Sequence, residues 1–177
     1  MIFGLFRKRN HNRIIVDRQY AFLTSTARIP YFYSDLGVPD TVMGRFEALS
    51  IHVFLFLARC RDDATLKPVA QDLVDRFMVD IEDSIREIGI GDPSVPKRMR
   101  KLAGMFYERV HAYDPPLHAG DTAALGAALK RHALPPEAGA DAAAGLAAYI
   151  LTRKSDWDGV PTAEIMRGRL VRGGGDI

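Results

Sequence analysis

The sequence lacks several features that define common classes of protein. Cys60 is the single cysteine in 177 residues, which excludes an internal disulfide and a multi-cysteine metal site and fits a reducing compartment. A net charge of +2 is too small to indicate nucleic-acid binding by itself. The best apolar run, residues 51–58, is far shorter than the roughly 18 residues that a membrane-spanning helix needs. We therefore expect a cytoplasmic protein.

Strand-like alternation and internal repeats are also missing, and what the sequence contains instead is apolar residues at helical spacing. A hydrophobic content of 47% and a charged content of 26% are ordinary for a folded domain, and the length suits one domain. We predict an all-α fold. It would be a single-domain irregular helical bundle over residues 13–170, followed by a disordered tail at 171–177.

Residues 1–12 precede that domain, and two interpretations of them stay open. One is a flexible N-terminal segment. The other is a peripheral contact with the inner face of the cytoplasmic membrane, in which apolar side chains insert and basic side chains meet anionic headgroups. The residues for that contact are Ile2, Phe3, Leu5, Phe6, Arg7, Lys8, Arg9 and Arg13.

The strongest helical pattern covers about residues 40–60. Asp40 or Thr41 would cap its start. Nearly every face is apolar from residue 51 to residue 58, which predicts a central helix surrounded by others. His52 lies in this run, and we interpret it as a core or rim histidine, not a ligand.

A charged helical hairpin is predicted over about residues 64–113. Its first helix carries Asp80, Asp83 and Glu87 along one flank of an apolar stripe, where the carboxylates would repel one another in isolation. The Gly- and Pro-containing stretch 89–96 would form the turn.

The second helix of the hairpin carries a basic patch, residues 97–101, in its first turns. Positive charge there opposes the helix dipole. Two explanations stay open, because the patch could pair with the acidic flank of the preceding helix or with an acidic partner. Asp114, Pro115 and Pro116 would end this helix.

The remaining segments are less distinctive. The connection before the central helix carries Tyr31, Phe32 and Tyr33, which would pack over the core edge or form a partner-binding patch. Residues 120–153 are rich in Ala and Gly and predict two closely packed helices, with Trp157 in the connection that follows them.

The sequence gives little support for a catalytic site or a metal site. Glu108 and His111 form one Glu-x-x-His motif, but the second motif that a di-metal bundle needs is missing. No nucleophile and base stand near the acidic row of the hairpin. The basic patch 97–101 has no interleaved aromatics for stacking on bases. We therefore predict no enzyme, no metal or other cofactor, and no specific nucleic-acid partner.

Two stretches resemble one known family. Residues 83–113, DSIREIGIGDPSVPKRMRKLAGMFYERVHAY, and residues 27–59, ARIPYFYSDLGVPDTVMGRFEALSIHVFLFLAR, are similar to the ubiquinol–cytochrome c chaperone family. The resemblance covers roughly residues 14–117. One departure is Glu108, where the family pattern leads us to expect a glycine, and another is the lack of the targeting segment that mitochondrial members have.

The resemblance implies a non-enzymatic chaperone that binds newly made cytochrome b and aids assembly of ubiquinol–cytochrome c reductase. It also implies a small co-chaperone or the ribosome as further partners. The alternative is a ribosome-associated or scaffold adaptor that uses the basic patch 97–101. The candidate partner-binding residues are Tyr31, Tyr33, Asp80, Asp83, Arg86, Glu87, Gly89, Gly91, Asp92, Lys97, Arg98, Lys101 and Tyr107.

Overall fold

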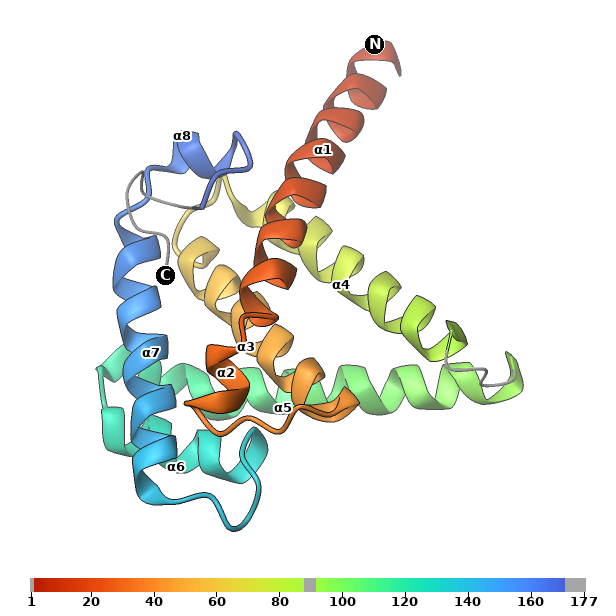
Figure 1. The fold of residues 1–177 in the computed structure, drawn as a ribbon. Coiled ribbons are helices and arrows are strands. Elements are labelled where there is room, and N and C mark those ends of the chain that lie inside the picture. Colours follow the sequence, from red (N-terminus) through yellow and green to blue (C-terminus); the bar gives the residue numbers. More distant parts are fainter. Residues whose placement is uncertain (1, 88–91, 171–177) are drawn as a thin grey trace.

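Helices make up most of the chain in the computed structural model, which describes residues 2–87 and 92–170, with the side chains of 13–87 and 93–170 (Figure 1). In chain order they are α1 (Ile2–Ala27), α2 (Tyr31–Ser34), α3 (Val42–Cys60), α4 (Lys67–Glu87), the 3-10 helix η1 (Asp92–Ser94), α5 (Val95–Ala119), α6 (Thr122–His132), α7 (Ala140–Asp158) and α8 (Thr162–Ile165). No strand occurs in these described ranges. The predicted all-α fold is thus confirmed.

Helix α3 lies at the centre, packed against α1, α4, α5 and α7. Its start is capped as expected, since the Gly44 amide donates to the Thr41 hydroxyl over 3.1 Å. Phe54 and Phe56, on different faces of the helix, are both buried. Burial on several sides agrees with the prediction of a central apolar helix, because apolar faces all round need neighbours all round.

Helices α4 and α5 form the predicted hairpin as an open V. The end of α4 and the start of α5 lie close together, whereas their other ends are far apart (Figure 1). Helix α4 buries its predicted stripe, which includes Leu73, Phe77 and Ile81, against α1, α3 and α5. The open side of the V is therefore occupied by α1 and α3.

Helix α5 corrects the predicted boundary at residue 114. It continues through Pro115 and Pro116 to Ala119 and ends at Gly120, whose φ of 66° is left-handed. Proline inside a helix removes a backbone hydrogen bond and costs about 3 kcal/mol. The buried side chains of Tyr113 and Leu117 flank the prolines and offset that cost by packing into the core.

Other boundaries differ as well. Helix α1 begins at Ile2, well before the predicted start at residue 13, and its first turns extend beyond the rest of the molecule (Figure 1). Trp157 was expected in a connection, but it lies in the last turn of α7 and is buried. The Ala-rich helices α6 and α7 pack against each other as expected, and Gly126 of α6 lies next to Ala143 of α7.

Candidate binding groove

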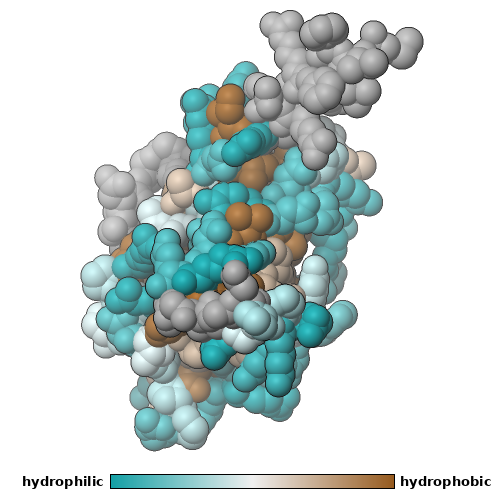
Figure 2. All heavy atoms as spheres, turned by 90° about the vertical axis from the view of Figure 1, so that its right-hand side faces the viewer, coloured by the Kyte–Doolittle hydropathy of each residue, from teal (hydrophilic) through white to brown (hydrophobic). Residues whose placement is uncertain are grey.

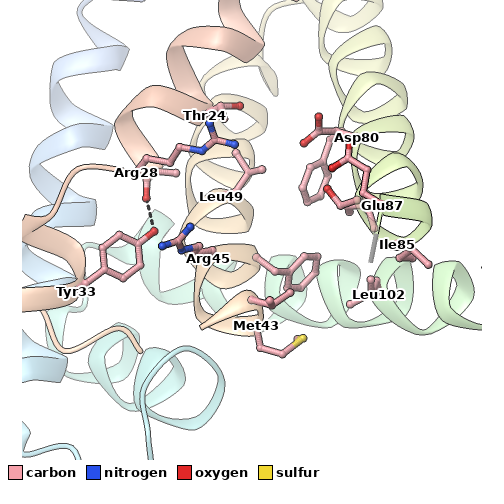
Figure 3. A pocket seen from close by; sticks show the side chains of 16 residues that line it. Thr24, Arg28, Tyr33, Met43, Arg45, Leu49, Asp80, Ile85, Glu87 and Leu102 are labelled. Carbon is pink, nitrogen blue, oxygen red and sulfur yellow. Dashed lines mark hydrogen bonds between the residues drawn. The ribbon is translucent and has the colours of Figure 1, made fainter. Parts of the chain in front are cut away.

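A cavity of about 340 Å³ opens between α1, α3, α4 and α5, with Tyr33 of α2 at one side (Figure 3). Its floor is apolar. Phe46 and Leu49 come from α3, Phe77 and Ile81 from α4, and Leu102 from α5. Because the V of α4 and α5 is open, α1 and α3 cannot fill all of the space between them, and this groove remains.

Aromatic packing shapes the floor of the groove. The rings of Phe46 and Phe77 stack with 6.2 Å between centroids, and Phe106 meets Phe77 edge-on at 5.1 Å. Phe77 and Phe106 are fully buried, whereas Phe46 is only half-buried. The floor is therefore a continuation of the hydrophobic core that remains accessible from outside.

The mouth of the groove exposes large apolar side chains. Val42 and Met43, in the first turn of α3, are 68% and 43% exposed. Val79 on α4 and Tyr107 on α5 are exposed elsewhere on the same two arms of the V. In Figure 2, seen from the right-hand side of Figure 1, apolar residues gather in a broken band between hydrophilic surfaces. Such accessible apolar surface is typical of a protein-binding site.

The α4 wall of the groove is acidic, with Asp80 and Glu87 (Figure 3). The Tyr20 hydroxyl donates to Asp80 over 2.9 Å, and Arg76 lies 3.6 Å from the same carboxylate. Burial, together with the neighbouring Asp80, raises the pKa of Tyr20 well above its ordinary value, so Tyr20 remains a donor. Asp80 is thus held in a fixed orientation.

The opposite wall is basic. Arg28, directly after the end of α1, and Arg45 of α3 line it (Figure 3). Arg45 pairs with Asp40 at 2.8 Å, and this hydrogen bond holds the pKa of Asp40 below its ordinary value. The Tyr33 hydroxyl donates to the Ala27 carbonyl over 2.7 Å and fixes the connection beside this wall. The groove therefore has an apolar floor between walls of opposite charge.

The structure brings some of the predicted site residues together and separates others. Tyr33, Asp80 and Glu87 line the groove, whereas Tyr31 and Asp83 are exposed outside it. The rest of the candidate set lies on the hairpin away from the groove. That set comprises Arg86, which pairs with Glu82, and the exposed Lys97, Arg98, Lys101 and Tyr107.

Some predicted contacts lie outside the described residues. They involve Gly89, Gly91, the tail 171–177 and the side chain of Asp92. They also involve the side chains predicted to meet lipid, which are those of Ile2, Phe3, Phe6, Arg7, Lys8 and Arg9.

In the described parts of the hairpin, the charges of its two helices do not pair across the V. Among residues 67–87 and 95–119, no ion pair joins a carboxylate of α4 to a basic side chain of α5. The acidic row instead receives Arg76, which lies within 4 Å of both Asp80 and Asp17. Lys97, Arg98 and Lys101, in the first turns of α5, therefore form no ion pair with the acidic row of α4 among the described side chains.

Two buried polar pairs escaped the sequence analysis. Arg109 of α5 donates to Glu47 of α3 through Nη2 at 2.8 Å and through Nε at 3.1 and 3.2 Å. His52 Nδ1 donates to the Ala48 carbonyl over 2.7 Å, and its Nε2 accepts from Tyr149 of α7 over 3.0 Å. A carboxylate within the apolar stripe of α3 was the signal that a buried cation must lie nearby.

Both buried pairs join helices within the core. Burial raises the pKa of the Glu47 carboxyl above its ordinary value, although the Arg109 guanidinium lowers it. Among the described side chains, no group of three or more His, Cys, Asp or Glu could hold a metal ion. His52 is a core histidine, as predicted. The groove, with its apolar floor and oppositely charged walls, is suited to binding a partner by shape and charge.

Crossing a bilayer requires a helix of sufficient length and apolar content, and none of the helices in the described part of the chain has both.

Comparisons with known proteins agree with this structure. A family model described as "Ubiquinol-cytochrome C chaperone" matches residues 34–172. The ubiquinol-cytochrome-c reductase complex assembly factor 1 of Xenopus laevis is 26% identical over 130 residues, which are 72% of this chain and 64% of that protein. The crystal structure of the Cbp3 homolog from Brucella abortus superposes with a TM-score of 0.85 at 42% identity, over 97% of this chain and 96% of that one.

Proposed function

Because this chain belongs to the ubiquinol-cytochrome C chaperone family, we propose that it is a non-enzymatic assembly factor that binds newly made cytochrome b during assembly of ubiquinol–cytochrome c reductase. The observation that carries the proposal is the groove, whose apolar floor and exposed mouth provide a binding surface for an unassembled protein. An assembly factor needs such a surface and no catalytic groups.

The charges of the groove suit a membrane protein as client. During insertion, such a client exposes apolar helices and basic cytoplasmic loops. The floor formed by Phe46, Leu49 and Phe77 would cover part of an apolar helix, and the acidic α4 wall would attract an adjoining basic loop. Binding at this site would protect the client from aggregation until the complex assembles.

A site-specific crosslinking experiment tests the proposal. A photoreactive amino acid at Met43, at the mouth of the groove, should capture newly made cytochrome b in cells that assemble the complex. The same amino acid at Lys130, exposed on α6 away from the groove, is the matched control and should not. Equal capture from both positions, or none from Met43, would contradict the proposed site. Normal assembly of the reductase after deletion of the gene would contradict the function.

The alternative function is a ribosome-associated or scaffold adaptor that uses the basic patch. One observation favours it, since Lys97, Arg98 and Lys101 are exposed and have no acidic partner among the described residues. Four positive charges within residues 97–101 suffice for nonspecific attraction to an acidic or polyanionic partner. A small co-chaperone with an acidic surface would fit the same patch.

We also propose that the protein works at the inner face of the cytoplasmic membrane. The backbone of α1 is helical from Ile2, and its first turns extend beyond the rest of the molecule (Figure 1). The sequence there places apolar residues before Arg7, Lys8 and Arg9. Deletion of residues 1–9 should lower flotation with anionic liposomes, and unchanged flotation would disprove the contact.

A further inference from the structure

On the basis of the proposed function, in which the groove holds the client, we infer that the groove accepts one face of an α-helix with its basic flank turned toward α4. The occupant is a helical segment of a partner protein. It has apolar residues at helical spacing, with Lys or Arg beside them on one edge. Backbone pairing, the size of the cavity and the placement of its charges each support this assignment.

The first argument concerns backbone hydrogen bonds. The floor of the groove is formed by Phe46, Leu49, Phe77, Ile81 and Leu102, which lie inside α3, α4 and α5, where backbone amides and carbonyls pair within the helix. An extended segment lying on this floor would bury its amides and carbonyls without partners, at a cost of about 1–3 kcal/mol for each group. A helix satisfies its own backbone, so a helix is the conformation that the groove favours.

The second argument concerns size. A helix with its side chains is about 10 Å across, and a cavity of about 340 Å³ has room for only a few apolar side chains. The occupant therefore lies across the mouth and inserts residues from one face, at positions such as i, i+3, i+4 and i+7. Met43 stands at that mouth, and its flexible thioether can adapt to inserted side chains of different shape.

The third argument concerns charge. Asp80 and Glu87 stand seven residues apart on α4, which is two turns of the helix, so both face the groove from one wall. Glu87 is exposed and has no cation beside it among the described residues. Arg28, on the opposite wall, has no described acidic partner either. A bound helix is therefore oriented with basic residues toward α4 and acidic or neutral ones toward α1.

Model peptides can test this against the full-length protein. Three fluorescent helical peptides share leucines at i, i+3, i+4 and i+7. The first has lysines on one flank, the second has glutamates there, and the third is the lysine peptide with a central proline. By anisotropy titration the lysine peptide should bind about 2- to 5-fold more tightly than the glutamate peptide, as expected for one exposed charge pair. The proline peptide should bind much more weakly than either, because it cannot remain helical.

Two variants test whether the preference for a lysine-bearing peptide arises from the charges of the groove. Glu87→Lys should reverse the preference, so that the glutamate peptide binds more tightly than the lysine peptide. Asp83→Lys makes the same change in net charge one turn away, at an exposed residue outside the groove, and should leave the preference as it was. Equal responses to both variants would overturn the orientation, since they would indicate a general charge effect.

Other outcomes separate this inference from the proposed function. If the proline peptide binds as well as the lysine peptide while Met43 still captures cytochrome b, the helix requirement is wrong and the client assignment remains. If the peptides behave as expected while Met43 captures no cytochrome b, the client is wrong and the helix requirement remains. Peptide binding that occurs only after removal of residues 171–177 would assign the groove to the chain's own end and would overturn the inference.

Discussion

Buried polar residues join the central helix to its neighbours at defined points. The Glu47–Arg109 pair connects α3 to α5, and the His52–Tyr149 hydrogen bond connects α3 to α7. Apolar contacts alone allow helices to slide past one another, whereas a buried hydrogen-bonded pair loses most of its favourable energy with a small shift. These single residues therefore contribute to the position of α5, one arm of the V that frames the groove.

The ion pair should be sensitive to the loss of one partner. Arg109→Met leaves the Glu47 carboxylate buried without a cation, and we expect the free energy of unfolding to fall by about 3–5 kcal/mol. The double variant Glu47→Leu with Arg109→Met should recover most of that loss, because no charge remains buried. Urea denaturation measures all three proteins. Arg167→Met, which breaks an exposed pair with Glu164, is the control and should cost less than about 1 kcal/mol.

His52 should make stability depend on pH. Burial lowers the pKa of His52 to about 4, from an ordinary value of 6.5, so the folded protein keeps it neutral. The unfolded chain takes up a proton below pH 6.5, and stability is therefore lost as the pH falls from 6.5 toward 4. The full loss is about 3 kcal/mol. Denaturation at several pH values measures it, with a smaller dependence expected for His52→Gln and an unchanged one for His118→Gln, which alters an exposed histidine. An unchanged dependence in His52→Gln would contradict the assignment.

At the scale of whole elements, small residues and prolines decide where helices begin and how closely they approach. Gly44, in the first turn of α3, lies against the Pro39 carbonyl, and a Cβ atom there would come within 1.8 Å of that oxygen. The connection that carries Tyr33 past the groove can therefore reach α3 only because residue 44 has no side chain. By contrast, the two prolines inside α5 do not end that helix, because the residues that flank them are buried.

Two glycine substitutions should have opposite effects. Gly44→Ala forces backbone atoms apart and should lower the free energy of unfolding by about 2–3 kcal/mol. Gly104→Ala, in the exposed middle of α5 with no atom within 4 Å of the added Cβ, should raise it by up to about 1 kcal/mol. Thermal denaturation followed by circular dichroism compares the two. Destabilisation of both to the same extent would mean that the contact with Pro39 is not the cause.

On the scale of the whole molecule, the open V separates two surfaces that the sequence places in one hairpin. The groove lies between the arms, whereas the basic patch, with Lys97, Arg98 and Lys101 exposed, lies in the first turns of α5, near the point where the arms meet. A substitution in the basic patch can therefore leave the groove unchanged, and the reverse also holds.

Charge reversal of the basic patch tests that separation. Lys97→Glu with Arg98→Glu and Lys101→Glu should leave the free energy of unfolding within about 0.5 kcal/mol, because these side chains are exposed and have no described acidic partner. Capture of cytochrome b from Met43 should also remain. Loss of co-sedimentation with ribosomes in this variant would support the adaptor function. The matched control reverses Lys67, Lys130 and Arg131, which are exposed elsewhere.

Spacing along single helices predicted part of the candidate site. The acidic flank of α4 was correctly placed on one face, and Asp80 and Glu87 line the groove. The opposite wall could not be predicted, because Arg28, which follows α1, and Leu49 of α3 come from segments whose relative positions depend on packing. Of the aromatics in the connection before α3, Phe32 packs into the core against His52 and Tyr149, whereas Tyr31 is exposed, and a partner-binding role for Tyr31 and Tyr33 stays a prediction.

The sequence by itself determined the helices, the buried central one among them, since helical periodicity and capping are local properties of the chain. It also determined the family, through two long ordered stretches. Only the tertiary structure decided that the hairpin opens into a V, that the described charges of α4 and α5 do not pair with each other across it, and that a groove with walls of opposite charge remains between its arms. The physical reason is that crossing angles and leftover space arise from how side chains of distant segments pack together.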